Sequence, residues 1–545
     1  MQGNLLDIEK KLLNRNKWAY SVGGIGRDMI YQLIATFFMT YVQYSGLKID
    51  AVQFGVIGII LIFGRVWDAI NDPIMGSIVE NTHTKWGKFR PWILIGGLLT
   101  AIVVIFMFNF RPEGWSFVVF FGLIYLVWEM TFTLNDIPYW SLIPALSKNK
   151  KDRDSITSMV VVFAGIGAFL ANAIISFTTT GDMVAGYSRI SITFAIFFVA
   201  CTCLTVFGVK EPTELIHENE EKITIKKMFA VIKNNDQLLW SALALMFYSV
   251  GSGILVALGY NFFYIELGYN GTLILIFLVT FAISNITIQA FYSKLANRFS
   301  RKTLMKASFI VLAVGYGLLL IVGFVPFIPM HIATVSFFGF FVFSGQAIFY
   351  MVIIVNMTNT IEYNEFKTGD RNEAIVFSLR PFVAKFSSAL QQGVVTLVLL
   401  ASGVFVLSQN ISELENQKNI FDQMDAIQQA EYLVNISARQ GIFDNSDLDE
   451  EQIEILYDAL EMVEFEGQIG AQTMIVNSAA DFAFKDLGTL SMRVMLRIAL
   501  AIVPVVLIYI SYWILNKKFI ITEEYYEQIT SAVKQKYAQD QSQET

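Results

Sequence analysis

Three ionisable residues lie close together in the stretch RVWDAINDP, residues 65 to 73, at the end of a long apolar run. Asp68 and Asp72 are four residues apart, and Arg65 is three residues before Asp68, so all three share one face of a helix. Each ionised side chain at the centre of a bilayer costs about 2.5–3.5 kcal/mol, which indicates a partner or a water-filled cavity. Pro73 also frees a backbone carbonyl one turn earlier. Two carboxylates and a free carbonyl predict a binding site for a small cation.

A purely structural interpretation of the same helix face stays open. Arg65 and Asp68 could form a buried ion pair whose only role is to hold two helices together. That pair leaves Asp72 unexplained, so the cation site is the interpretation that accounts for all three groups.

The first apolar stretch carries a second charged pair, Arg27 and Asp28, in the sequence GGIGRDMIYQ. Tyr31 and Gln32 follow Asp28 by three and four residues and share its helix face. A carboxylate flanked by hydrogen-bonding groups suits a polyhydroxylated ligand such as a sugar. A charge patch near the membrane surface is the alternative.

The fourth apolar stretch ends in EMTFTLNDIPYWSLIPAL, where Thr133, Asp136 and Trp140 form one helical stripe. Pro138 and Pro144 loosen the backbone there. We expect Asp136 to contribute to the cation site and also to bind a sugar hydroxyl. Trp140 is expected to stack on the apolar face of a sugar ring, with plain packing of the indole as the alternative.

A further charged pair lies late in the chain, where LRPFVAKFSS places Arg380 and Lys385 in an apolar stretch. Lys385 lies deep in that stretch, where an ammonium group needs a carboxylate partner or must extend to the membrane surface. Arg380 lies nearer the end of the stretch and is expected to extend to the interface.

The elements that carry these groups are predicted to be membrane-spanning helices. Of the 545 residues 55% are hydrophobic and 16% are charged, whereas soluble domains carry about 25% charged residues. Stretches long enough to span a bilayer predict an all-α polytopic fold with twelve transmembrane helices in two six-helix halves, which is typical of the major facilitator architecture. They lie near 18–44, 51–79, 91–110, 115–146, 155–178, 187–209, 237–266, 270–296, 301–325, 330–362, 375–403 and 487–515.

Charged segments predict the domain organisation. Alternate loops are rich in Lys and Arg, which places them and both termini in the cytoplasm. We expect a first half over 1–209, a cytoplasmic linker over 210–236, helices seven to eleven over 237–403, an acidic, helical, extracellular insertion over 404–486, a twelfth helix over 487–515 and a cytoplasmic tail over 516–545. No P-loop and no metal-ligand spacing is visible, so we expect no ATP-driven transport, no enzyme activity and no cofactor besides a coupling cation.

Two long motifs, RVWDAINDPIMGSIVENTHTKWGKFRPWILIGG and NDIPYWSLIPALS, resemble the glycoside–pentoside–hexuronide:cation symporter family. The resemblance covers nearly all of 18–403 and the last span. It implies a cation site, which could hold Na⁺, made of Asp68, Asp72, Thr133 and Asp136, with Asn71 nearby. It implies substrate contacts from Arg27, Asp28, Asp136, Trp140, Tyr350 and Lys385.

The chain departs from the family pattern at two positions. Val161 stands where family members carry an arginine that helps to hold the sugar, and Glu129 stands where a small residue is expected. Glu129 is one turn before Thr133 and would join a charge network with Arg65 and Arg380. These differences argue against an unaltered sugar specificity and bear on the cation preference.

The sequence therefore predicts a multi-pass transporter of the cytoplasmic membrane that couples glycoside import to Na⁺ or H⁺ by alternating access. Sodium is the first choice, because carboxylates and a hydroxyl are hard oxygen ligands. The expected partners are a small glycoside, a monovalent cation and the lipid bilayer; we expect a monomer that binds no nucleic acid. Two alternatives stay open: a carrier of a non-sugar cargo such as a lysolipid, and a non-transporting sensor that binds a partner through 404–486.

Overall fold

The computed structural model is helical throughout the part of the chain that it describes, apart from one isolated bridge between Thr84 and Gly87. The described residues are 2–82, 84–147, 149–180, 183–210, 235–268, 270–369, 373–409, 412, 425, 427 and 488–544. They form two compact units. The first unit contains Met1–Glu218, Asn261–Leu278 and Thr396–Arg493, and the second contains Asn219–Tyr260, Val279–Val395 and Val494–Thr545.

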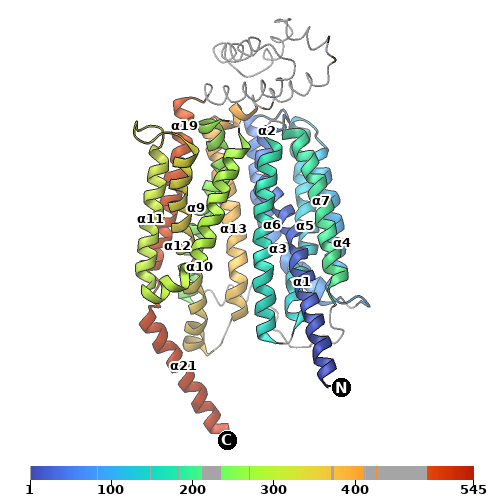
Figure 1. The fold of residues 1–545 in the computed structure, drawn as a ribbon, viewed down its shortest axis with the longest axis vertical. Coiled ribbons are helices and arrows are strands. Elements are labelled where there is room, and N and C mark those ends of the chain that lie inside the picture. The colour runs from blue at the N-terminus through green and yellow to red at the C-terminus, as the bar shows by residue number, and fades with distance from the viewer. Residues whose placement is uncertain are drawn as a thin grey trace. The chain divides into compact units, whose positions relative to one another are not determined.

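The helices are numbered in the order in which they follow one another along the chain (Figure 1). The first seven are α1 (Gln2–Ala35), α2 (Phe38–Tyr44), α3 (Ala51–Glu80), α4 (Arg90–Asn109), α5 (Gly114–Leu146), α6 (Lys150–Thr179) and α7 (Met183–Gly208). The later ones are α9 (Asp236–Leu267), α10 (Gly271–Arg298), α11 (Arg301–Ile321), α12 (Ile332–Thr368), α13 (Glu373–Ala401), α19 (Leu490–Arg497), a π-helix (Ile498–Ile502), α20 (Val503–Lys517) and α21 (Glu523–Glu544).

Eleven helices in the described residues are long and apolar enough to cross a membrane. The first predicted span, 18–44, is not among them. It is divided between α1 and α2 by a turn at Thr36 and Phe37, and α1 carries Arg27 and Asp28 in its apolar half. The total of twelve spans and the cytoplasmic location of the termini therefore stay predictions.

Small residues allow the helices of the first unit to pack closely, with α1 against α6 and α7, α4 against α5 and α7, and α3 against α5. A Cβ atom placed on Gly26 would lie 2.9 Å from the Cα atom of Phe198, and one on Gly96 would lie 2.5 Å from the backbone nitrogen of Asn135. Glycine is therefore required where α1 meets α7 and where α4 meets α5. Both contacts support the helices that carry the candidate site.

The second unit is built on α11 and α12, with α20 packed on α11 and α21 packed on α12. Arg301, at the start of α11, anchors α21. Its backbone N–H and its Nε atom donate to Glu523 Oε1 at 2.6 and 3.2 Å, and its Nη2 atom donates to the carbonyl of Ile521 at 3.2 Å. The predicted tail at 516–545 thus contains a helix held by a specific ion pair.

The predicted acidic insertion falls mostly outside the described residues, as does the linker over 211–234. Its first residues, 404–409, are helical. Phe405 stacks on Phe54 of α3 with ring centroids 4.2 Å apart, and Gln409 Nε2 donates to the carbonyl of Gln43 at 2.7 Å. The start of the insertion therefore packs within the first unit.

Candidate functional site

A buried hydrogen bond joins two predicted cation ligands on different helices. The Thr133 hydroxyl on α5 donates to Asp68 Oδ1 on α3 at 3.1 Å, and the two residues are 2% and 5% exposed. Asp72 follows Asp68 by one turn of α3 and is half-buried, as is Asn71. The two helices that the sequence analysis singled out thus bring a carboxylate and a hydroxyl together. No group of three or more His, Cys, Asp or Glu side chains with metal-binding geometry was found in the described part of the chain.

Arg27 joins the two predicted sugar-binding carboxylates. Its Nη2 atom lies 2.9 Å from Asp28 Oδ2, and its Nη1 atom donates to Asp136 Oδ1 on α5. The Arg27 side chain is 7% exposed, whereas the two carboxylates are 21% and 23% exposed. Asp28 and Asp136 are therefore fixed by a buried cation and keep accessible surface for a ligand. The expected second role of Asp136, beside Asp68 and Thr133, stays a prediction.

Two aromatic rings that contact each other edge-on also lie against the Arg27 guanidinium. Its central carbon lies 4.8 Å from the ring centroid of Tyr139 and 4.6 Å from that of Trp140, which is within the range of a cation–π interaction. Trp140 is 37% exposed. Its ring contacts Arg27, so it does more than pack against neighbouring helices. Its stacking on a sugar stays a prediction.

Tyr20 and Tyr139 form a reciprocal pair that the sequence analysis missed. Their rings stack with centroids 4.4 Å apart. The Tyr20 hydroxyl donates to the Tyr139 carbonyl at 2.5 Å, and the Tyr139 hydroxyl donates to the Tyr20 carbonyl at 2.9 Å. Tyr139 could have been found from its position three residues after Asp136. Tyr20 had no comparable signal, because its role depends on the crossing of α1 and α5.

A second buried arginine lies between α3 and α5. Arg65 Nη1 is 3.6 Å from Glu129 Oε1, and the two side chains are 6% and 2% exposed. The rings of Tyr31 and Trp128 lie 5.6 and 5.9 Å from the Arg65 guanidinium carbon. The structure therefore gives Arg65 a carboxylate partner, Glu129, that differs from Asp68, the partner expected in the purely structural interpretation.

Tyr31 and Gln32, the two hydrogen-bonding residues expected beside Asp28, make contacts with other residues. Tyr31 packs against Phe132, with ring centroids 5.4 Å apart, and faces Arg65. Gln32 Oε1 accepts a hydrogen bond of 2.6 Å from the Thr36 hydroxyl. Gln32 is thus engaged near the turn that ends α1.

Among the predicted site residues of the first unit, acids outnumber arginines. Two arginines, Arg27 and Arg65, are accompanied by five acids, Asp28, Asp68, Asp72, Glu129 and Asp136. A net charge of −3, if all are ionised, is unfavourable inside a membrane. Binding a cation would reduce it, and this is the chemistry that the arrangement offers.

Three of the predicted residues, Arg380, Tyr350 and Lys385, belong to the second unit. Arg380 is exposed, and its Nη2 atom donates to the Tyr350 hydroxyl at 2.5 Å. Tyr350 stacks on Tyr248 with centroids 5.8 Å apart. Lys385 is half-buried on α13. Val161, which stands where an arginine was expected, belongs instead to the first unit. It lies on α6 and is 58% exposed.

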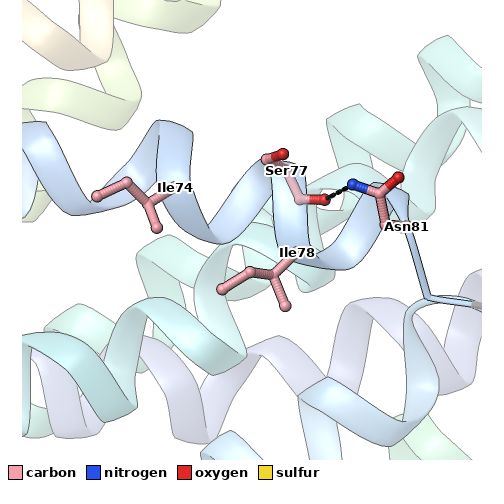
Figure 2. Close-up of a pocket in the computed structure, with 4 residues that line it drawn as sticks. All are labelled: Ile74, Ser77, Ile78 and Asn81. Carbon is pink, nitrogen blue, oxygen red and sulfur yellow. Dashed lines mark hydrogen bonds between the residues drawn. The ribbon is translucent and has the colours of Figure 1, made fainter.

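A hollow lies on α3 beyond Asp72 and is lined by Ile74, Ser77, Ile78 and Asn81 (Figure 2). Asn81 Nδ2 donates to the carbonyl of Ser77 at 2.8 Å, within the hollow. None of these four described residues is charged, so none of them would select a cation.

Comparison with known proteins places this geometry in a family. Residues 19–422 match the family described as MFS/sugar transport protein. The chain is similar to the lactose permease of Lactobacillus delbrueckii subsp. bulgaricus, with 29% identity over 414 residues, and to the raffinose carrier protein of Pediococcus pentosaceus, with 25% identity over 409 residues. These matches cover 73% and 71% of this chain but 64% and 62% of the relatives, so the chain spans less than two thirds of their length.

A solved structure shares the fold. The crystal structure of a bacterial homolog to the human lysosomal transporter Spinster aligns with a TM-score of 0.55 and 10% identity, over 93% of this chain and 98% of that one. Together with the eleven candidate spans, the comparisons show a multi-pass protein of the plasma membrane. The resemblance to the glycoside–pentoside–hexuronide:cation symporters is confirmed, and the chain belongs to the MFS/sugar transport protein family, whose members are membrane transporters and not enzymes.

Proposed function

We propose that this protein imports a glycoside across the plasma membrane and that a gradient of Na⁺ or H⁺ drives the import. The observation that carries the proposal is the buried hydrogen bond between Thr133 on α5 and Asp68 on α3. It brings a carboxylate and a hydroxyl together one helix turn before Asp72. Oxygen ligands from two helices suit a small hard cation, which supports Na⁺ as the first candidate.

The cation and the sugar would be coupled through charge. A bound cation neutralises part of the excess negative charge at Asp68 and Asp72 and so lowers the free-energy cost of enclosing them. A ligand shifts a conformational equilibrium only by its difference in affinity for the two states. Transporters of this architecture bind substrate near the membrane midplane and move two halves around it.

The sugar would bind at the cluster formed by Arg27, Asp28 and Asp136, which we call the Arg27 group. Asp28 and Asp136 have accessible carboxylate surface for sugar hydroxyls, and the guanidinium of Arg27 fixes both of them. Trp140 is the proposed stacking surface. Tyr350 and Lys385 of the second unit are proposed as further contacts. The names of the relatives, a lactose permease and a raffinose carrier, support a sugar over a lysolipid as the cargo.

Uptake by proteoliposomes tests the proposal. Radiolabelled lactose and raffinose are supplied with an inward Na⁺ gradient, an inward H⁺ gradient, both or neither. We expect one gradient to drive accumulation of at least one sugar above its external concentration. Equal uptake under all four conditions would refute cation coupling. Inhibition by a lysolipid, with no uptake of or competition by any sugar, would favour the alternative cargo.

A further inference from the structure

The buried pair of Arg65 and Glu129 has no role in the proposed transport cycle as described above. We propose that Glu129 is a positioning carboxylate, which holds the Arg65 guanidinium away from Asp68 and Asp72 and thereby sets the affinity for the coupling cation. This inference rests on the proposed function and deepens it, because it names a residue that tunes the cation site without binding the cation.

Glu129 is the carboxylate that forms an ion pair with Arg65 across α3 and α5. Arg65 Nη1 and Glu129 Oε1 are 3.6 Å apart, and both side chains are almost fully buried. Arg65 lies against the rings of Tyr31 and Trp128, which restrict the guanidinium from two sides. Arg65 Nη1 has no hydrogen-bond partner in the described part of the chain, so at this atom the compensation is electrostatic. In a buried site such charge compensation has a large effect.

Arg65 competes with any cation for the same carboxylates. It lies one turn before Asp68 and two turns before Asp72 on the same face of α3, and its Nη1 atom lies 3.6 Å from Glu129 Oε1. Without the charge of Glu129, Arg65 would use Asp68 as its counter-charge, and an incoming cation would have to displace it. Glu129 therefore favours cation binding in two ways: it adds a nearby negative charge, and it occupies the competing arginine.

A structural role would give a different result, and the chain offers a matched control. Glu266 and Arg493 form another ion pair in the first unit, with Oε2 and Nη1 3.5 Å apart and the side chains 5% and 23% exposed. A substitution of Glu266 removes a comparable ion pair but has no proposed connection with the cation site. If substitutions of Glu129 and Glu266 change the cation constant equally, the change reports on folding and not on the cation site.

The experiment measures two constants in proteoliposomes made with each variant: the half-saturating concentration of the coupling cation for lactose or raffinose uptake, and the KM of the sugar at saturating cation. We expect Glu129→Gln to raise the cation constant about tenfold, equivalent to about 1.4 kcal/mol, and to leave the sugar KM within about twofold. Glu129→Asp should restore most of the affinity, and Glu266→Gln should leave the cation constant unchanged.

A double substitution keeps the inference testable even if Glu129→Gln fails to reach the membrane. In Glu129→Gln combined with Arg65→Gln, both charges are removed, so the cation constant should return to within about threefold of the wild-type value. A cation constant that is unchanged in Glu129→Gln, or a tenfold loss that persists in the double variant, would overturn the inference. If sugar uptake by the wild-type protein depends on neither Na⁺ nor H⁺, the proposed function is refuted, and this inference with it.

Discussion

Replacing Asp72 by asparagine tests the cation site most directly, because it removes one charge and preserves the shape of the side chain. Asp72 follows Asp68 by one turn of α3 and is half-buried. A cation about 4 Å from a carboxylate gains about 4 kcal/mol at an effective dielectric constant of 20. Because Asp72 is half-buried, water screens part of that interaction, and about 2 kcal/mol is a reasonable value. We therefore expect a loss of about 30-fold in cation affinity.

The consequence for transport follows from the coupling. If cation binding fails, a gradient can no longer drive accumulation, whereas exchange of labelled for unlabelled sugar needs no gradient. We expect Asp72→Asn to abolish concentrative uptake of lactose or raffinose in proteoliposomes and to keep measurable counterflow.

Two further aspartates serve as controls for this variant. Asp28→Asn should weaken sugar binding and leave the cation constant nearly unchanged, because Asp28 belongs to the Arg27 group. Asp236→Asn, which alters an exposed pair with Lys367 in the second unit, should change neither constant. If Asp72→Asn accumulates sugar with the cation dependence of the wild-type protein, the assignment of Asp72 to the cation site is wrong.

Three further experiments test the supports of the site and of the tail. Tyr20→Phe removes a buried hydrogen bond to a carbonyl of α5, so we expect a several-fold rise in the sugar KM and an unchanged cation constant in the same uptake assay. Gly26→Val should reduce the amount of folded protein recovered from membranes, because its side chain would meet the backbone of α7, whereas Gly165→Val on α6, where a Cβ atom meets nothing within 4 Å, should be tolerated. Burial alone would raise the pKa of Glu523, but hydrogen bonds from the backbone and side chain of Arg301 hold that pKa below its ordinary value of 4.5. The pair should therefore stabilise the docked α21 at neutral pH and lose this effect as the pH falls below about 4.5. Limited proteolysis should cleave the tail of the wild-type protein faster below about pH 4.5 than at neutral pH. If Glu523→Gln shows the same pH dependence, the assignment of that dependence to Glu523 is wrong.

The sequence alone was sufficient to predict the helical membrane fold and eleven of its candidate spans. Hydropathy along a span is a local property, and the predicted spans correspond to the described helices. The first span is the exception: it is divided into α1 and α2, and its polar groups lower its hydropathy. The turn at Thr36 and Phe37 contains neither Pro nor Gly, so no local turn signal in the sequence predicted this division.

Tertiary structure decided which charged groups meet. Helical spacing placed Arg65 and Asp68 on one face of α3, but only the packing of α3 on α5 brought Thr133 to Asp68 and Glu129 to Arg65. The same holds for Arg27, whose contact with Asp136 spans more than one hundred residues of sequence. Periodicity determines which face of a helix a residue occupies, whereas the rotation and depth at which two helices pack determine which side chain lies opposite it.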